Sequence, residues 1–486
     1  MDNSITGEFA ARSFSGYWKI HHRDYPQEYF GEFLYDPIKG LHELTLYGIC
    51  ISPNIGVCPI PVITGSATIG KKVTIFDLVV KGATSGTGDT ISQKTIFTFI
   101  SCCIGDVFFT TKDSVRLRKY SFRCSNLEVW ANYHPFYFKF SKRRKRNLGK
   151  IDHPMPLLIY EDDVVRIKLE TIIIQGMHQF SMNLSYHHKI TIEAKGNRKL
   201  PYWGQKNCFC YYEKAICCFC GLIIGKHAVS FNHIGIIEKK RKTMPTDVFP
   251  GLVKRRFFLY PNIEFFNARK IEENWLERID CSQVLLKREK MDDETLRKAT
   301  QCFFAKFSQF DFVLDDWMAM RNRSSYTNHS LPEMLYNIEG LHRALYPECD
   351  SNPGYSDTIN AIHEISPFDD YNALIKSQKN GLYFRQRLQD ILLIKVVPVY
   401  SFLTILQKKM IVDYLVDVRN NAAHRNQEAD FSFQKMVACI FLCEQVIAIM
   451  IFLKIGLPID AIYNNLKNTQ EYDYLKEKLP IIFNGK

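Results

Sequence analysis

Apolar and polar residues alternate along much of the first ~200 residues, which is typical of strands with one buried face. The clearest case is residues 31–51, GEFLYDPIKGLHELTLYGICI, where Pro37 and Gly40 separate two β-rich runs at positions suited to a hairpin turn. Together the runs predict a twisted antiparallel sheet or sandwich. Further strands are predicted at 71–80, 94–103, 126–140, 164–174 and 188–194.

The apolar period becomes helical from about residue 205 and dominates after Asp293. The pattern predicts an α+β protein, with a β-rich antiparallel domain at 1–285 and an all-α bundle at 286–486. Within the first domain, strands reach about residue 195 and are followed by a helix and an irregular region. Helices are predicted at 205–226 (ending at Gly225), 293–309, 310–321, 331–346, 383–393, 404–424, 436–453 and 459–479.

The most apolar window, residues 436–453, is about long enough to span a bilayer. Glu444 and Gln445 lie at its centre, where charge is costly in a membrane, so we expect a buried core helix and no membrane association. The N-terminus has no basic and apolar leader, and the 15 cysteines have no regular spacing. We therefore expect a protein of the reducing cytoplasm.

A net charge of +12 favours a polyanionic partner such as nucleic acid. Two basic runs could hold phosphates without reading sequence, although a solvated loop with no specific partner is equally consistent with them. They comprise Lys142, Arg143, Arg144, Lys145 and Arg146 in the first run, and Lys239, Lys240, Arg241 and Lys242 in the second.

Two motifs have better structural than chemical interpretations. GSATIGKK, residues 65–72, has the glycines of a phosphate-binding loop, but Lys72 replaces the magnesium-binding hydroxyl and a strand follows, so a hairpin turn is expected. On a helix, Cys210 and Cys217 would lie about 10 Å apart, too far to share one zinc. Buried structural cysteines are therefore favoured over a zinc site at Cys208, Cys210, Cys217, Cys218 and Cys220.

Residues 416–426, VDVRNNAAHRN, close a helix whose apolar positions Leu406, Met410, Ile411, Leu415 and Val418 keep a helical period. Arg419 and His424 have the chemistry of a metal-independent ribonuclease, because His moves protons near neutral pH and Arg binds phosphate oxygens.

On an ideal helix, Arg419 and His424 lie about 140° apart, whereas Asn420 and His424 share a face. Arg419 and His424 can meet at one phosphate only if the helix ends or distorts near His424, or if two protomers pair. A solvated helix end remains an alternative.

The Arg419-Asn420-x-x-x-His424 pattern late in a helical bundle resembles the signature of HEPN ribonucleases. Residues 336–345 resemble the first long HEPN helix, with Glu339 at its usual acidic position. Residues 16–48 followed by 63–80 resemble the N-terminal domain of ApeA-like proteins. The resemblance thus covers both halves. In place of the bulky apolar residue and Thr of many members, this chain has Asn421, Ala422 and Ala423.

This resemblance implies an anti-phage abortive-infection protein that cleaves RNA, with tRNA one possible substrate. Its β-rich half would hold substrate, sense a phage trigger or restrain the nuclease. The resemblance also implies a homo-oligomer, a dimer or a higher oligomer, that assembles through the HEPN domain and uses no cofactor and no metal. His424 would act as general base or acid, Arg419 would bind the scissile phosphate, Asn420 would orient them and Glu339 would support the site. The expected products carry 2′,3′-cyclic phosphate and 5′-hydroxyl ends.

Two alternatives belong to other functional classes. One is a non-catalytic module that dimerises through the helical bundle and binds nucleic acid through its basic surface. The other is a metal-dependent enzyme built on the cysteine cluster.

Overall fold

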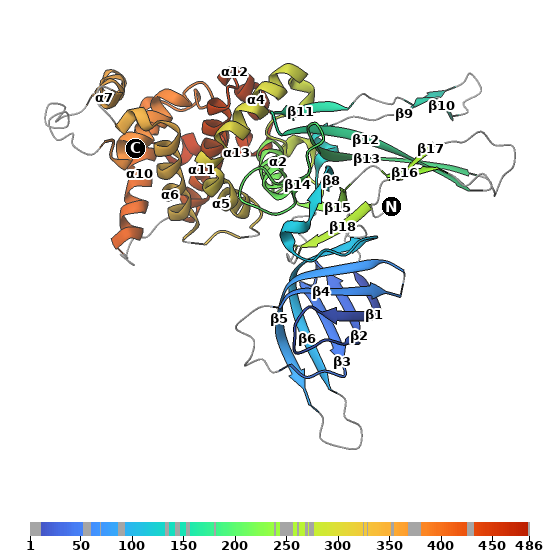
Figure 1. Ribbon diagram of the computed structural model, residues 1–486. Helices are drawn as coiled ribbons and strands as arrows, with labels where there is room; N and C mark the ends of the chain where they lie inside the picture. Colours follow the sequence, from blue (N-terminus) through green and yellow to red (C-terminus); the bar gives the residue numbers. More distant parts are fainter. Residues whose placement is uncertain are drawn as a thin grey trace. The chain divides into compact units, whose positions relative to one another are not determined.

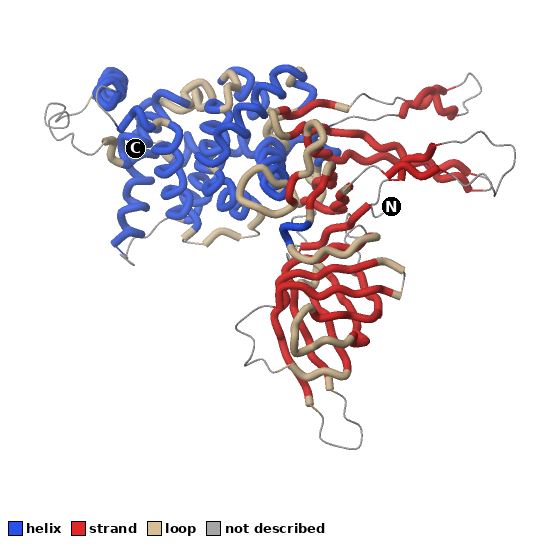
Figure 2. Tube along the Cα trace, viewed as in Figure 1, coloured by secondary structure: helices blue, strands red, loops and turns tan. Residues whose placement is uncertain are grey.

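The computed structural model divides into two compact units: unit 1 comprises Met1–Glu128, Tyr133–Ile216 and Val229–Arg278, and unit 2 comprises Val129–Asn132, Cys217–Ala228 and Ile279–Lys486. Strands dominate the first and helices the second (Figure 2). The predicted boundary between 285 and 286 stays a prediction. The residues described are 11–51, 60–68, 70–85, 93–131, 136–140, 146–151, 156–178, 181–237, 240–243, 256–259, 262–267, 271, 277–323, 325–327, 329–350, 354–367, 381–424 and 432–484.

Unit 1 begins with a closed six-stranded antiparallel barrel (Figure 1). The strands pair in the order β6-β3-β2-β1-β4-β5, and β5 then pairs with β6 to close the ring. The predicted antiparallel sheet is confirmed, but as a barrel with a sheet extension. The barrel strands are β1 (Arg12–Ile20), β2 (Glu28–Asp36), β3 (Leu41–Tyr47), β4 (Ile60–Ala67), β5 (Lys72–Thr84) and β6 (Lys94–Gly105).

Aromatic residues fill the barrel. Trp18 and Phe33 are fully buried, and Phe33 stacks on Phe99 at 5.3 Å between ring centroids. The Trp18 indole lies directly over Gly65, and its Nε1 donates to the Gly31 carbonyl at 3.3 Å. Gly65 is thus required by the space that the indole occupies, rather than by any phosphate contact. The predicted hairpin in GSATIGKK is confirmed, because β4 and β5 pair on either side of it.

β6 continues the sheet beyond the barrel. Its first half pairs with β3, whereas Ser101–Ile104 pair with β18, and β5 runs along its other edge. The extension continues in the order β18-β15-β8-β13-β12-β11. These strands are β8 (Lys119–Cys124), β11 (Leu157–Glu161), β12 (Val165–His178), β13 (Ser181–Ala194), β15 (Ser230–Ile236) and β18 (Asn262–Asn267).

Helix α2 (Phe209–Ile224) packs against the sheet extension through Phe209. The Phe209 ring centroid lies 5.6 Å from that of Tyr120 on β8. The helix ends as predicted at Gly225, which adopts the left-handed conformation with φ of 85°.

The strand predicted over 126–140 is only partly correct. Leu127–Ala131 form helix α1, and β9 (Phe136–Phe140) follows. Trp130 of α1 donates from its indole nitrogen to the Leu286 carbonyl at 3.0 Å, a tertiary contact that local alternation does not predict.

Unit 2 is a helical bundle, as predicted. Its helices are α4 (Asp293–Lys306), α5 (Asp311–Arg321), α6 (Ser330–Leu345), α7 (Gly354–Ile365), α9 (Phe384–Asp390), α10 (Ile405–His424), α11 (Phe433–Lys454), α12 (Ile459–Leu466) and α13 (Gln470–Ile482). The single helix predicted over 459–479 is wrong, because the Thr469 hydroxyl accepts from the Tyr472 amide and starts a new helix there. Helix α7 was not predicted.

Helix α11 is the one described helix that is long and apolar enough to cross a membrane, but 83% of its most apolar window is buried inside the protein. Its Glu444 pairs with the Arg321 guanidinium at 3.1 Å, and Arg321 also binds Glu471 at 2.6 Å. The Trp317 indole donates to the Glu444 carbonyl at 2.9 Å. These contacts agree with the interpretation of α11 as a core helix.

Substituting Gly65 with Ala should destabilise unit 1, because the added methyl would overlap the Trp18 indole. We expect a loss of about 1–3 kcal/mol in the free energy of unfolding, the usual cost of overpacking. Gly82→Ala is the matched control, since the space around that strand position is open. Urea denaturation of both variants measures the difference, and equal stability would contradict the packing described.

Glu444→Gln should flatten the pH dependence of stability. Burial raises the pKa of Glu444 from 4.5 to about 7 despite the nearby Arg321. The folded state therefore holds this proton more tightly, and the stability it contributes is full below pH 4.5 and lost as pH rises through about 7. The slope should fall by up to about 1.4 kcal/mol per pH unit. Denaturant unfolding across this pH range measures the slope, and Glu477→Gln, at an exposed glutamate, is the control. If the slope of Glu444→Gln stayed as unchanged as that of the control, the expectation would be contradicted.

Candidate functional site

Helix α10 has nearly the predicted bounds and carries the whole Arg-Asn-x-x-x-His pattern. Ile411, Leu415 and Val418 are buried as expected, and Met410 is partly buried. Leu406 is instead exposed, which is a correction to the predicted apolar face. The inward positions of the first turn are taken by Gln407 and Lys408, which are buried there.

Arg419 is held on several sides by residues from α6 and α9. Its Nη2 atom lies 3.4 Å from a carboxylate oxygen of Glu339. Its guanidinium carbon lies 5.9 Å from the Tyr336 ring centroid and 5.6 Å from that of Phe384. The Nε atom is buried and has no hydrogen-bond partner among the described residues. These contacts restrict the side chain to one arrangement while leaving it 31% exposed.

The Glu339 carboxylate is shared between two arginines. It accepts from Arg343, one helical turn away, at 2.7 Å, which is closer than its contact with Arg419. Two cations thus face one carboxylate, and an excess positive charge remains at Arg419. A partly exposed guanidinium with this excess charge is suited to binding a phosphate.

The structure describes fewer contacts for the other residues of the Arg-Asn-x-x-x-His pattern. Asn420 is exposed on the next position of α10, and Asn421 is half-buried. His424 is the last described residue of the helix, and its side chain lies outside the described part of the chain. The structure therefore places Glu339 in an ion pair with Arg419. The catalytic roles of Arg419, Asn420 and His424 stay predictions.

A buried polar network links α6 to α9 beside this site. Arg387 of α9 donates to His342 Nδ1 at 3.0 Å, and His342 Nε2 lies 2.9 Å from an Asp390 oxygen. Since a guanidinium can only donate, Nδ1 must accept, and Nε2 carries the proton donated to Asp390. Arg387 also binds Asp350 at 2.5 Å.

The predicted basic runs lie mainly outside the described residues, which exclude Lys142, Arg143, Arg144, Lys145 and Lys239. We expected these runs in loops, whereas their described members lie in strands. Arg146 begins β10 (Arg146–Ile151), and Lys240, Arg241 and Lys242 belong to β16 (Lys240–Thr243). Their proposed contacts with RNA stay a prediction.

Residues 13–206 match the family ApeA N-terminal domain 1, and residues 334–460 match the family Apea-like HEPN. The chain is an ApeA-like HEPN protein. The HEPN match contains Glu339, Arg387, Arg419 and His424, so the site described above lies within the HEPN domain. HEPN domains generally belong to ribonucleases. No curated protein and no solved structure is significantly similar to the chain.

His342, Cys349 and Asp390 in the HEPN domain have potential metal ligands within 4.8 Å of one another. Both ring nitrogens of His342 are engaged, one by the permanently cationic Arg387 and one by Asp390. A divalent cation there would have to displace Arg387 and overcome its charge. The geometry therefore fits a structural hydrogen-bond network better than a metal centre.

The cysteines predicted to be structural lie on or beside α2. Cys208, Cys218 and Cys220 are buried, whereas Cys210 and Cys217 are half-buried. Burial raises the pKa of the Cys208 and Cys210 thiols, which disfavours the thiolate that a metal needs. These observations support the structural interpretation.

Sequence reasoning named Glu339 but missed Tyr336 and Phe384, the aromatic residues beside Arg419. Tyr336 precedes Glu339 by three positions on α6, and this spacing places both on one helix face. Phe384 has no comparable local signal, because α9 is brought to Arg419 only by the packing of the HEPN domain.

A double-mutant cycle can measure the pairing of Glu339 with Arg419. Glu339→Gln and Arg419→Gln should show a coupling of about 0.5–1 kcal/mol in unfolding free energy, because the pair is partly exposed and Glu339 also binds Arg343. Glu333→Gln replaces Glu339→Gln in the control cycle, since Glu333 is an exposed α6 residue that pairs with Arg323 instead. Equal coupling in both cycles would show that the described ion pair is not the source.

Proposed function

We propose that the protein is a metal-independent endoribonuclease of an anti-phage abortive-infection system. The observation that carries this proposal is Arg419, a positively charged and partly exposed group of the HEPN domain. It is fixed by a glutamate and two aromatic rings. RNA is the substrate class that matches both the HEPN domain and the net charge of +12, and tRNA is the first RNA to test.

In this proposal His424 moves the proton. As a general base it would remove the 2′-hydroxyl proton, so that the 2′ oxygen attacks the adjacent phosphorus and the bond to the 5′ oxygen breaks. A proton must then reach the departing 5′ oxygen, and a second histidine at a dimeric site could supply it. Arg419 would bind the phosphate oxygens as negative charge develops on them. The products would carry 2′,3′-cyclic phosphate and 5′-hydroxyl ends.

Helix geometry supports a dimeric active site. Helix α10 extends to His424, five residues after Arg419, so their backbone positions lie about 140° apart around the helix. Two α10 helices side by side would let the arginine of one protomer share a phosphate with the histidine of its partner. Asn420, one turn before His424, shares its face and would orient the histidine or the phosphate. Small residues at 421–423 leave room for a close helix or RNA approach.

His424→Ala and Arg419→Ala should each lower RNA cleavage by ~10²-fold or more, the scale expected for loss of a proton-transfer or charge-stabilising group. Cleavage is measured on total RNA and tRNA by sequencing the new ends, with phage infection supplying the trigger. EDTA should leave the wild-type rate unchanged. Growth arrest on infection should also disappear in both variants.

Arg297→Ala is the matched control, because Arg297 is an exposed arginine of α4 outside the site. Circular dichroism of all variants checks that the helices are intact. Cleavage that persists without His424 would refute the assignment of roles. RNA binding that weakens with salt, without cleavage under any trigger, would favour the non-catalytic binding module instead.

A further inference from the structure

Unit 1 contains a cavity of about 480 Å³ where the barrel strands β1 and β2 meet the sheet extension. Its volume falls within the range of small-molecule pockets, roughly 300–1,000 Å³. Every residue that lines it belongs to unit 1. None of them belongs to the HEPN site, so the cavity is a separate feature of the protein.

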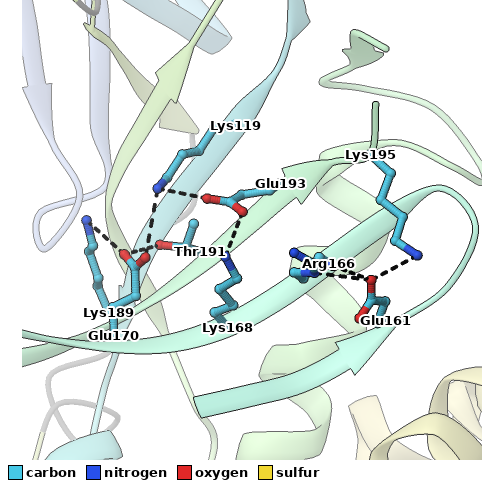
Figure 3. A network of polar contacts seen from close by, with 9 residues as sticks. All are labelled: Lys119, Glu161, Arg166, Lys168, Glu170, Lys189, Thr191, Glu193 and Lys195. Carbon is cyan, nitrogen blue, oxygen red and sulfur yellow. Dashed lines mark hydrogen bonds and ion pairs between the residues drawn. The ribbon is translucent and has the colours of Figure 1, made fainter. Parts of the chain in front are cut away.

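The lining combines cations with aromatic rings. Arg12, Arg123 and Lys189 supply positive charge, and each of them also pairs with a carboxylate. Glu264, which lies 3.9 Å from Arg12, is the one carboxylate among the described lining residues. The guanidinium carbon of Arg123 lies 5.0 Å from the Phe231 ring centroid, and Lys189 is at one end of the network of ion pairs drawn in Figure 3. The aromatic lining residues are Tyr35, Phe122, Phe231, Phe265 and Phe266.

Two polar residues that line the cavity are held by residues that are not part of its lining. Glu213 of α2 accepts from the Ser230 hydroxyl at 2.7 Å and from the Tyr120 hydroxyl at 2.5 Å. The same tyrosine oxygen lies 2.5 Å from His233 Nδ1. Ser230 and His233 both line the cavity, and Nε2 remains as the ring nitrogen with which His233 can contact a ligand. The half-buried Glu213 carboxylate thus orients two potential ligand contacts.

Figure 3 shows how Lys189 connects to the adjoining sheet face. Lys189 binds Glu170 at 3.2 Å, Glu170 lies 3.9 Å from Lys119, and Lys119 binds Glu193 at 3.1 Å. Lys168 then binds Glu193 at 2.9 Å. Three lysines therefore alternate with two glutamates, and positive charge remains in excess. Lys189 and Lys168 are the two ends of this chain.

We propose that this cavity binds a nucleoside phosphate, either as a free nucleotide or as one nucleotide of an RNA strand. The cations Arg12, Arg123 and Lys189 receive the phosphate. The aromatic lining accommodates the base, and Glu264 accepts hydrogen bonds from ribose hydroxyls. Binding here does not depend on the ribonuclease proposal, because no cleavage is needed to observe it.

The lysine chain provides a matched pair of variants. Lys189 and Lys168 each pair with one glutamate at a similar distance, and their side chains are 27% and 23% exposed, but only Lys189 lines the cavity. Lys189→Met should weaken nucleotide binding tenfold or more, whereas Lys168→Met should change it less than twofold. Arg12→Met, at an exposed strand start, is a second cavity variant that leaves the lysine chain intact.

Isothermal titration calorimetry on the full chain would use AMP, GMP, CMP and UMP, with adenosine and inorganic phosphate as the separate halves of the ligand. A 2′-O-methyl pentaribonucleotide, which cannot form a cyclic phosphate, is the RNA arm. Binding of a mononucleotide that is weakened by Lys189→Met or Arg12→Met supports a free nucleotide. Binding of the oligonucleotide alone with the same dependence supports an RNA strand.

Three results would overturn the proposal. They are no binding of any nucleotide at millimolar concentration, equal losses in Lys189→Met and Lys168→Met, and inorganic phosphate binding as tightly as the nucleotides. Thermal unfolding of each variant confirms that the domain is folded, and loss of RNA cleavage elsewhere in the protein leaves these measurements unaffected.

Discussion

The buried hydrogen bonds of His342 with Arg387 and with Asp390 fix the geometry of the HEPN site. His342 lies three positions after Glu339 on α6, and Arg387 lies three positions after Phe384 on α9. The network therefore sits one helical turn from the two groups that contact Arg419, Glu339 and Phe384. Because buried ionic groups are costly unless all partners are present, α6 and α9 have little freedom to shift. Arg419 is positioned by this rigidity.

The same arrangement explains why the site is basic although a glutamate lies at its centre. Arg343 takes the closer share of Glu339, so the carboxylate orients Arg419 without fully neutralising it. A phosphate approaching Arg419 would replace the long contact to Glu339 rather than a tight ion pair. The helical spacing between Arg419 and His424 then makes the partner protomer part of the proposed chemistry.

Features with local signals were predictable from the sequence. The turn at Pro37–Gly40, the end of α2 at Gly225 and the bounds of α10 follow from residue preferences and apolar period. Glu339 was found through the family resemblance. Closure of the barrel was not predicted, because pairing of β5 with β6 is set by strand curvature and packing around Trp18. Phe384 beside Arg419 and the helical α1 were missed for the same reason, since each depends on contacts distant in sequence.

Strand β6 belongs to the barrel and to the extension at once, because residues 101–104 bond to β5 on one edge and to β18 on the other. Glu264, Phe265 and Phe266 of β18 line the cavity. A displacement of these residues is transmitted to the barrel strands through continuous backbone hydrogen bonds rather than through a flexible linker. The barrel and the sheet extension therefore deform together when the residues at their junction move.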